Sequence, residues 1–483
     1  MTPMKKQFKD YGLSKEILKA IEGLHFTQPT PVQEEVIPQA LKGLDLLVKS
    51  QTGSGKTAAF AIPLCEKLKW EENKPQVLVL TPTRELALQV KEDFFNIGRF
   101  KRVKTVGLYG KAPMHIQQKE LKQKTHVVVG TPGRVLDHLE RGTLITDEIS
   151  YLVIDEADEM LKMGFLDQVE SIIKVLPKER MTLLFSATLS QHIEALSKKY
   201  MKDPVAITIE SKHLTADKVE QVCYQVESSK KLECLKDILT VENPECCMIF
   251  SNTKDQVDGI EDYLKENEIP ILKIHGGLEQ RDRFAAMEDF RRGKFRYLVA
   301  TDVAARGIDI DHITHVINFD VPEDKESYVH RIGRTGRGGR SGKAITLATS
   351  RDKRFLEAIY DYTGYEVPNS PVPSREEVER ARAEFEATHN KSLKLQPTKA
   401  EKLNQDILKL HINAGKKTKM RPVDIVGTLC NLPNMCADDI GIINIQDVST
   451  FVEILNGKGE MVFKQLQTTP IKGRLRKVSR ADA

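Results

Sequence analysis

The chain has 483 residues, of which 40% are hydrophobic and 29% charged, and its formal net charge is +4. The length suits two or three domains, and the composition is ordinary for a soluble globular protein. No apolar run approaches the roughly 18 residues of a membrane span, and the start, MTPMKKQFKD, lacks the apolar core of a signal peptide, so we expect neither. The seven cysteines include no CxxC pair, which favours neither a disulfide framework nor a zinc site. We expect a cytoplasmic protein without a membrane partner.

The first 210 residues alternate short apolar strands with amphipathic helices, which is typical of parallel βαβ units. Strands are predicted at residues 46–49, 77–81, 104–109, 126–130, 151–154, 182–186 and 206–209. The alternation resumes after a polar stretch, with strands predicted at 219–226, 247–250, 271–275, 297–300, 315–318 and 344–348. Residues 1–210 and 217–366 are therefore predicted to be two α/β domains of similar construction.

The last part of the chain has a different composition. Residues 367–402 are predicted to be a linker with a helix at 376–387. Residues 403–479 have the predicted order strand, helix, strand, strand, helix, strand, at 407–413, 422–432, 440–446, 450–456, 460–467 and 474–479. This βαββαβ order is that of an RNA-recognition-motif sheet and predicts a small α+β domain.

Positive charge is concentrated in that last part. Residues 401–483 hold 13 Lys and Arg against 9 Asp and Glu, which accounts for the whole net charge of +4. A basic appendage on a neutral body favours a module that binds a polyanion. A merely solvated surface is the alternative interpretation.

The segment LLVKSQTGSGKTAA (46–59) joins an apolar run to a glycine-rich turn and the start of a helix. Small residues let backbone N–H groups approach phosphates, and the helix N-terminus adds positive potential. Lys56 is placed to reach the β- and γ-phosphates, and the Thr57 hydroxyl to ligate Mg²⁺. We predict that ATP and Mg²⁺ bind here, with a plain glycine turn as the alternative. The predicted nucleotide-binding residues are Ser50, Gln51, Thr52, Gly53, Ser54, Gly55, Lys56 and Thr57.

The predicted second half of this site is the segment YLVIDEAD (151–158). Its apolar residues form a buried strand, and ligands of an open parallel sheet bind at the carboxyl ends of the strands. Asp155 is predicted to hold Mg²⁺ through water, and Glu156 to orient and deprotonate the attacking water. The alternative is an acidic helix start, and the presence of Lys56 favours the catalytic interpretation.

With DEAD at 155–158 after the phosphate loop, residues 8–365 resemble the DEAD-box RNA helicase family. The resemblance implies two tandem RecA-like domains, RNA-stimulated ATP hydrolysis and local unwinding of RNA duplexes. HFTQPTPVQ (25–33) is similar to the family's adenine-reading motif, which implies that Gln33 contacts the adenine edge and Phe26 stacks nearby. TDVAARGID (301–309) is similar to its loop for RNA and ribose, which implies a ribose contact by Asp309.

Further segments resemble the motifs with which the family grips RNA. SAT (186–188) resembles the element that links the ATP state to RNA binding. The RNA-binding residues implied by the resemblance are Pro82, Thr83, Arg84, Gly110, Thr131, Gly133, Arg134, Gln280, Arg283 and Thr301.

HRIGRTGR (330–337) is similar to the family's last motif, which implies that Arg334 and Arg337 are arginine fingers. Arginines at 331, 334 and 337 would share one face if the segment is helical, and we expect one of them to pair with carboxylates instead. Fingers in a different domain from Lys56 and Glu156 suit a hydrolytic site that is complete only when the domains close.

The third domain resembles the C-terminal RNA-binding domain of DbpA-type helicases, which are associated with large-subunit ribosomal RNA. In the predicted strand at 450–456, Val452 and Ile454 alternate with Phe451, so Phe451 can face out and stack on a base. Ser449 and His411 occupy neighbouring positions where aromatic residues are usual. Basic residues offer an electrostatic alternative, and we expect a mixed mode with more weight on them. These are Lys416, Lys417, Lys419 and, at strand period, Lys472, Arg474 and Arg476.

These features predict a monomeric ATP-dependent RNA helicase that unwinds short duplexes while its third domain holds it near a structured RNA. The expected partner is 23S ribosomal RNA in the pre-ribosomal large subunit. The alternatives are an ATP-gated RNA clamp without unwinding, a DNA-translocating helicase and a general cold-shock RNA helicase. Glu156, Arg334 and Arg337 argue against the clamp.

Overall fold

The structure is a computed structural model that describes residues 6–51, 53–209, 219–305, 310, 312–337, 340–389, 391, 395 and 401–481, apart from the side chain of residue 402. These residues form two sheets of seven strands and one sheet of four. Two tandem parallel-sheet domains and a small α+β domain were predicted, and the fold class is confirmed. None of the helices in the described ranges is long and apolar enough to cross a membrane.

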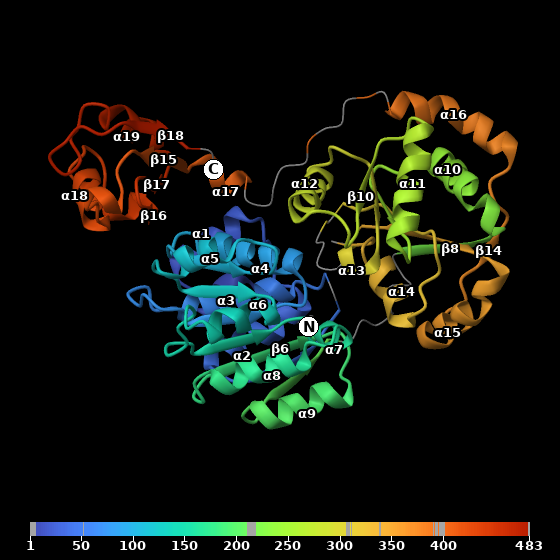
Figure 1. Cartoon of the computed structure of the whole chain (residues 1–483), viewed down its shortest axis with the longest axis horizontal. Coiled ribbons are helices and arrows are strands. Elements are labelled where there is room, and N and C mark those ends of the chain that lie inside the picture. Colours follow the sequence, from blue (N-terminus) through green and yellow to red (C-terminus); the bar gives the residue numbers. More distant parts are fainter. Residues whose placement is uncertain are drawn as a thin grey trace. The chain divides into compact units, whose positions relative to one another are not determined.

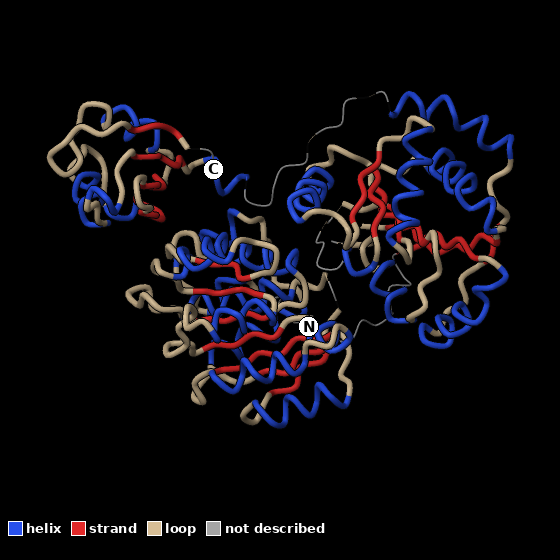
Figure 2. Tube along the Cα trace, in the orientation of Figure 1, coloured by secondary structure: helices blue, strands red, loops and turns tan. Residues whose placement is uncertain are grey.

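The first domain is a parallel sheet with helices on both faces (Figures 1 and 2). Its short strands are rich in Val, Leu and Ile because both faces of the sheet are covered, and the strand order is β3-β4-β2-β5-β6-β1-β7. The strands are β1 (Leu46–Lys49), β2 (Val77–Leu80), β3 (Thr105–Leu108), β4 (Val127–Gly130), β5 (Tyr151–Ile154), β6 (Met181–Ser186) and β7 (Val205–Thr208). The helices are α1 (Lys15–Gly23), α2 (Pro31–Lys42), α3 (Lys56–Lys67), α4 (Arg84–Ile97), α5 (Met114–Leu121), α6 (Pro132–Glu140), α7 (Ala157–Lys162), α8 (Leu166–Val175) and α9 (Gln191–Tyr200).

The second domain repeats this construction, with strand order β10-β11-β9-β12-β13-β8-β14. Its strands are β8 (Val219–Gln225), β9 (Cys247–Phe250), β10 (Ile271–Ile274), β11 (Tyr297–Ala300), β12 (His315–Asn318), β13 (Gly342–Ala348) and β14 (Asn369–Ser370). Its helices are α10 (Lys231–Glu242), α11 (Lys254–Glu266), α12 (Gln280–Arg291), α13 (Asp302–Ala305), α14 (Lys325–Ile332), α15 (Lys353–Thr363) and α16 (Arg375–His389).

Much of the segment assigned to a linker from the sequence packs on the second domain. Strand β14 pairs with β8, and α16 packs on α10. The predicted helix at 376–387 lies within α16, where Val378 and Phe385 are buried and Phe385 joins the core of the domain. These two residues are seven positions apart and share one helical face, so α16 buries an apolar stripe.

The third domain has an antiparallel sheet of order β16-β17-β15-β18. Its elements are α17 (Glu401–Gln405), β15 (Leu408–Ile412), α18 (Pro422–Cys430), β16 (Ile440–Ile445), β17 (Thr450–Ile454), α19 (Gly459–Gln465) and β18 (Val478–Arg480). The βαββαβ order from β15 to β18 is the predicted one. The strand expected at 474–479 is corrected, because β18 begins only at Val478 and a turn at Gly473 (φ 72°), closed by an Ile471–Arg474 bridge, precedes it.

The turn between α1 and α2 has a left-handed residue other than glycine. His25 has φ 60°, a conformation that costs an L-residue roughly 1–2 kcal/mol. His25→Gly should therefore raise the free energy of unfolding by about 0.5–1 kcal/mol, the gain being reduced by the greater backbone entropy of unfolded glycine. Urea unfolding measures the change.

A matched control for this prediction is His115→Gly, since His115 is an exposed residue inside α5. There glycine should lower the free energy of unfolding by roughly 0.5–1 kcal/mol, because it replaces a better helix former. The same sign of change at both positions would contradict the assignment of strain to His25.

Candidate nucleotide and RNA site

The strand order of the first domain separates its predicted site residues into two adjoining groups. Predicted nucleotide residues follow β1 and β5, and SAT begins at the end of β6; these three strands are neighbours in the sheet. Predicted RNA residues follow β2, β3 and β4, which are the strands on the other side of β5. Ligands bind at the carboxyl edge of such a sheet. The predicted site at this edge therefore has two adjoining halves, one for the nucleotide and one for RNA.

The phosphate loop ends where α3 begins, at Lys56. Gly55 has φ 91°, and a Cβ atom there would lie 2.6 Å from Gln33 Nε2, so the loop requires glycine at this position. Lys56 is only 6% exposed, and its Nζ donates to the Ser50 carbonyl at 3.3 Å. The interior of the loop is thus reached by one ammonium group and by the N-terminus of α3. Thr57 is the second residue of α3, Gln51, Gly53 and Ser54 lie in the loop, and Thr52 is outside the described residues.

Two hydroxyl groups of this loop suit an oxygen-rich ligand. The Ser50 and Ser54 Oγ atoms are buried without a hydrogen-bond partner among the described residues. Buried polar groups are normally satisfied, and phosphate oxygens accept hydrogen bonds from such donors. The residues present therefore fit a triphosphate.

Gln33 connects the start of α2 to the phosphate loop. Its Oε1 accepts a hydrogen bond from the Thr30 N–H at 3.0 Å, and its Nε2 donates to the Gly55 carbonyl at 3.1 Å. Phe26 is half-buried, with its ring centroid 6.5 Å from that of Phe8. The segment expected to read adenine is therefore in contact with the loop expected to hold phosphate.

Four carboxylate residues are buried after β5: Asp155, Glu156, Asp158 and Glu159. Asp155 is 2% exposed, and burial raises the pKa of its carboxyl, while the nearby Lys56 ammonium opposes the rise. Asp155 Oδ1 accepts the Glu156 N–H at 3.0 Å, and Glu156 stands before α7 with φ 53°. A left-handed residue other than glycine often marks a functional site. Asp155 offers carboxylate oxygens of the kind that a divalent cation such as Mg²⁺ prefers.

Asp158 links this corner to the SAT segment. Its Oδ2 accepts the Thr188 N–H at 3.3 Å and lies 3.5 Å from Thr188 Oγ1. Ser186 Oγ donates to the Thr188 carbonyl at 2.6 Å. A change at the DEAD segment can therefore be transmitted to the turn after β6.

The predicted RNA half is built on two helix N-termini. Pro82 and Thr83 precede α4, and the Thr83 hydroxyl accepts the Leu86 N–H at 3.2 Å. Thr131 precedes α6, and Gly133 lies in its first turn. Helix N-termini attract anions, so both helices suit contacts with a phosphate backbone.

The two predicted arginines of this half differ in their contacts. A Cβ atom on Gly110 would lie 3.2 Å from Arg84 Nη2, so the guanidinium packs closely on that glycine. Arg134 Nη1 donates to the Ala112 carbonyl and to Gln117 Oε1, both at 2.9 Å. Arg134 is therefore held by the protein itself, which orients its remaining N–H groups.

Sequence reasoning missed Gln117, which is buried on α5. Besides Arg134, its amide contacts His138 Nε2 at 3.1 Å and donates to the Tyr109 carbonyl at 3.0 Å. Burial lowers the pKa of His138 to about 4, so its ring is neutral. A glutamine in a polar helix carries no local signal for this role.

In the second domain, Gln280 and Arg283 lie in the first turn of α12 and are both buried. The turn before them is held by His275, which sequence reasoning also missed. Its Nδ1 accepts the Gly277 N–H at 3.2 Å, so the proton is on Nε2, which lies 3.1 Å from Asp258 Oδ1. Thr301 follows β11, and Asp309 lies outside the described residues.

Among the three spaced arginines, Arg331 forms a buried ion pair with Asp302. It is 1% exposed and donates to both Asp302 oxygens at 2.6 Å, to Asn252 Oδ1 at 2.9 Å and to the Asp320 carbonyl at 2.6 Å. Arg334 is buried after α14, and Arg337 Nε donates to the Gly333 carbonyl at 2.8 Å. Arg331 thus anchors the segment that carries the two predicted fingers.

The outer face of the third sheet carries an aromatic pair. Val452 and Ile454 are fully buried, as predicted, whereas Phe451 is half-buried opposite His411, with ring centroids 5.0 Å apart. Lys409 Nζ lies 5.7 Å from the Phe451 ring centroid. Aromatic rings beside a lysine suit a stacked base and its phosphate.

The predicted basic residues of this domain lie in loops. Lys416 and Lys417 are exposed in a 3₁₀ turn after β15. Arg474 and Arg476 precede β18, so the expected strand period of Lys472, Arg474 and Arg476 is wrong. Lys472 pairs with Asp424 at 2.9 Å.

Three family models match the chain: DEAD/DEAH box helicase at residues 30–196, helicase conserved C-terminal domain at 230–339, and DbpA RNA binding domain at 409–480. ATP-dependent RNA helicase DbpA of Bacillus subtilis (strain 168) is 57% identical, covering 98% of this chain and 99% of the relative. DEAD-box ATP-dependent RNA helicase CshA of the same strain is 42% identical over 77% of this chain and 75% of its own. The structure of S. cerevisiae Dbp5 bound to RNA and ADP BeF3 is 32% identical with a TM-score of 0.72, and the match covers 79% of this chain and 99% of the Dbp5 chain.

Proposed function

Because this chain belongs to the DbpA-type DEAD-box ATP-dependent RNA helicases, with a C-terminal RNA-binding domain, we propose that its substrate is 23S ribosomal RNA during assembly of the large subunit. The observation that carries the proposal is the match of the DbpA RNA binding domain model to residues 409–480 in the third domain. Its outer face offers Phe451 and His411 for stacking and Lys409 for phosphate. Assembly of ribosomal RNA would place the protein in the cytoplasm, where we propose that it acts as a monomer.

The first domain would supply most of the hydrolytic chemistry. Lys56, the N-terminus of α3 and the Ser50 and Ser54 hydroxyls would hold the phosphates of ATP, with Gln33 and Phe26 at the adenine. Thr57 and Asp155 would hold Mg²⁺, Asp155 through water, and the ion when bound would neutralise phosphate charge. Glu156 would orient the attacking water and accept its proton.

The remaining residues would make hydrolysis depend on RNA. Thr83, Arg84, Gly110 and the helix N-termini after β2 and β4 would bind one RNA strand by its backbone, a mode with little sequence preference. In the second domain Gln280, Arg283 and Thr301 would bind RNA, Asp309 would contact the ribose, and Arg334 and Arg337 would stabilise the charge that develops on the transferred phosphoryl group. The hydrogen bonds that Asp158 accepts from Thr188 would couple the two halves of the first domain.

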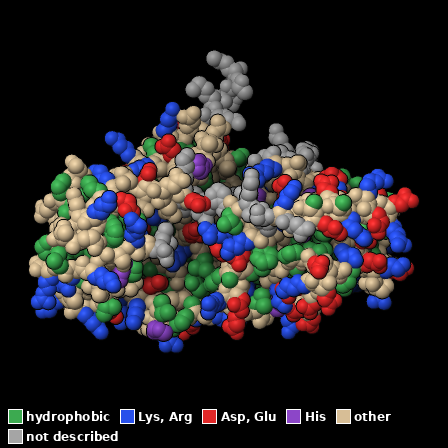
Figure 3. Space-filling view, turned by 90° about the horizontal axis from the view of Figure 1, so that it is seen from above, with side chains coloured by type: hydrophobic (Ala, Val, Ile, Leu, Met, Phe, Trp, Pro, Cys, Tyr) green, Lys and Arg blue, Asp and Glu red, His purple; other side chains and the backbone are tan. Residues whose placement is uncertain are grey.

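The third domain would select the RNA by raising its local concentration. Tethering the third domain to the two helicase domains increases avidity by roughly 10²–10⁴, although the helicase domains make no new contacts with RNA. Figure 3 shows acidic and basic side chains interspersed over one face of the molecule, and residues 401–483 carry the whole net charge. RNA preference should therefore reside in the third domain.

We predict that residues 1–389 remain an RNA-dependent ATPase but lose the preference for ribosomal RNA. Truncation after residue 389 keeps α16, whose Phe385 is part of the core of the second domain. ATPase activation by a 23S fragment is compared with activation by poly-A, for this truncation and for the full chain. Equal preference in the two proteins would favour a general RNA helicase.

In the full chain, replacing Lys416, Lys417, Arg474 and Arg476 by glutamine should flatten the salt dependence of binding to the 23S fragment. The expected change is about one unit of slope for each lost phosphate contact. Lys174→Gln, an exposed lysine of α8, is the control and should leave the slope unchanged. An unchanged salt dependence of binding in the fourfold variant would show that these four residues do not contact the RNA phosphates.

A further inference from the structure

The second domain contains a cavity of about 360 Å³ that is remote from its predicted RNA residues. Pro270 precedes β10, and Tyr297 is the first residue of β11, so the cavity lies at the amino ends of these strands. Gln280 and Thr301 follow the carboxyl ends of the same two strands. The cavity therefore opens on the opposite edge of the sheet, and its volume is within the range of small-molecule sites.

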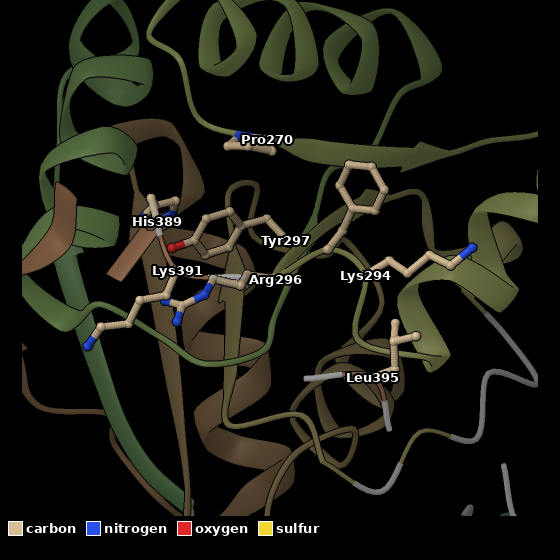
Figure 4. A pocket seen from close by; sticks show the side chains of 8 residues that line it. Pro270, Lys294, Arg296, Tyr297, His389, Lys391 and Leu395 are labelled. Carbon is tan, nitrogen blue, oxygen red and sulfur yellow. The ribbon is translucent and has the colours of Figure 1, made fainter. Parts of the chain in front are cut away.

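Basic and polar groups gather on one side of this cavity. Figure 4 shows Tyr297, Arg296, His389 and Lys391 on one side and Leu395 with Lys294 on the other. Among the residues that the structure describes, the eight that line the cavity include three cations and no carboxylate, and Pro270, Phe295 and Leu395 supply apolar surface. Lys294 is paired with Asp289 at 2.6 Å. An anion attached to an apolar group matches this lining.

Three polar atoms of the lining are buried without a hydrogen-bond partner among the described residues: Tyr297 Oη, Arg296 Nε and His389 Nε2. Tyr297 is 0% exposed, and its hydroxyl lies near the Arg296 guanidinium without a hydrogen bond of normal geometry. An unsatisfied buried polar group destabilises the folded state. Three in one cavity indicate that a ligand completes it.

The protonation of His389 indicates which hydrogen-bonding groups the ligand must carry. His389 Nδ1 lies 2.9 Å from the Phe385 carbonyl, which only an N–H can satisfy. Burial lowers the pKa of His389, with the Arg296 charge acting in the same direction, so the ring is neutral. Nε2 is then an acceptor, and it needs an O–H or N–H of the ligand, whereas Tyr297 and Arg296 Nε need an acceptor.

We propose that this cavity binds a nucleoside monophosphate. The phosphate would accept hydrogen bonds from Tyr297 and Arg296 and lie near Lys391, an O–H or N–H of the nucleoside would donate to His389, and the base would lie on Pro270, Phe295 and Leu395. Such a ligand satisfies the three unpartnered atoms together and combines an anion with an apolar group, as the lining does with its cations and its apolar surface.

The test uses the full chain saturated with Mg²⁺ and ADP, so that the phosphate loop of the first domain is filled. AMP is titrated and its binding is measured by calorimetry, with inorganic phosphate and a 5′-phosphorylated oligoribonucleotide titrated separately. We expect AMP to bind more tightly than phosphate. Absence of AMP binding, or binding of the oligoribonucleotide alone, would overturn the proposal.

Two tyrosine variants provide the decisive comparison. Tyr297→Phe should weaken AMP binding about tenfold or more by removing a hydrogen bond to a charged group, and should raise the thermal midpoint of the protein without AMP. Tyr328→Phe is the matched control, since Tyr328 is equally buried but donates to Gln221 Oε1 at 2.9 Å. It should lower the midpoint and leave AMP binding unchanged.

The same comparison can contradict the proposal in two ways. Equal AMP binding by Tyr297→Phe and the unaltered chain would show that the Tyr297 hydroxyl does not contact AMP. A lower midpoint for Tyr297→Phe without AMP would show that the hydroxyl has a structural partner, and the cavity would then need no ligand. Lys391→Gln, at an exposed side chain, should weaken AMP binding without changing the midpoint, and equal binding would remove the lysine from the site.

Discussion

The variant Glu156→Gln is expected to lose about 10²–10⁴-fold of RNA-stimulated ATP turnover while its affinities for ATP and RNA stay near normal. The amide is nearly isosteric with the carboxylate but cannot act as a general base, and a base contributes a rate factor of this size. The glutamine can also occupy the buried, left-handed position before α7. Phosphate release under saturating RNA measures the turnover, and equilibrium titrations measure the affinities.

Glu140→Gln is the matched control for this variant. Glu140 is exposed at the last residue of α6, away from the carboxyl edge of the sheet, and its substitution should change neither turnover nor affinity. Hydrolysis by Glu156→Gln at a near-normal rate would exclude Glu156 as the base.

Replacing Arg334 or Arg337 by alanine should reduce RNA-stimulated turnover far more than ATP affinity. Arginine fingers contribute about 10³–10⁵ to the rate in related phosphoryl transfers, because they stabilise charge that develops in the transition state. Both residues follow α14 in the second domain, whereas Lys56 and Asp155 belong to the first. Single-turnover hydrolysis is measured beside the affinity for ATP, and proportional losses of both would contradict the finger assignment.

Arg331→Ala tests the same segment with a different expected outcome. The Arg331 guanidinium is buried against Asp302, and removal of one partner of a buried ion pair costs about 3–5 kcal/mol of stability. This variant should therefore unfold at a markedly lower urea concentration. A stable Arg331→Ala protein with the catalytic defect expected for Arg334→Ala would indicate that Arg331 is an arginine finger and not a structural anchor.

Several features of this protein were determined by local sequence alone. The apolar run, glycine turn and lysine at 46–56 predict a strand, a loop and a helix start, and each needs only its chain neighbours. The alternation of Val452 and Ile454 with Phe451 likewise predicts which side chains are buried, because the side-chain period of a strand is two residues. The two parallel sheets and the βαββαβ domain follow from such patterns.

Other features were decided only by the tertiary structure. Arg331, Arg334 and Arg337 have the same spacing, and Arg331 is distinguished by Asp302 and Asn252, which are far from it in sequence. Gln117 and the packing of α16 on α10 likewise depend on partners distant along the chain. The spacing of apolar residues predicts which face of a helix or strand is buried. The role of a buried polar group, in contrast, depends on the partner with which it forms a hydrogen bond or an ion pair. That partner is brought near only when the strands and helices assemble.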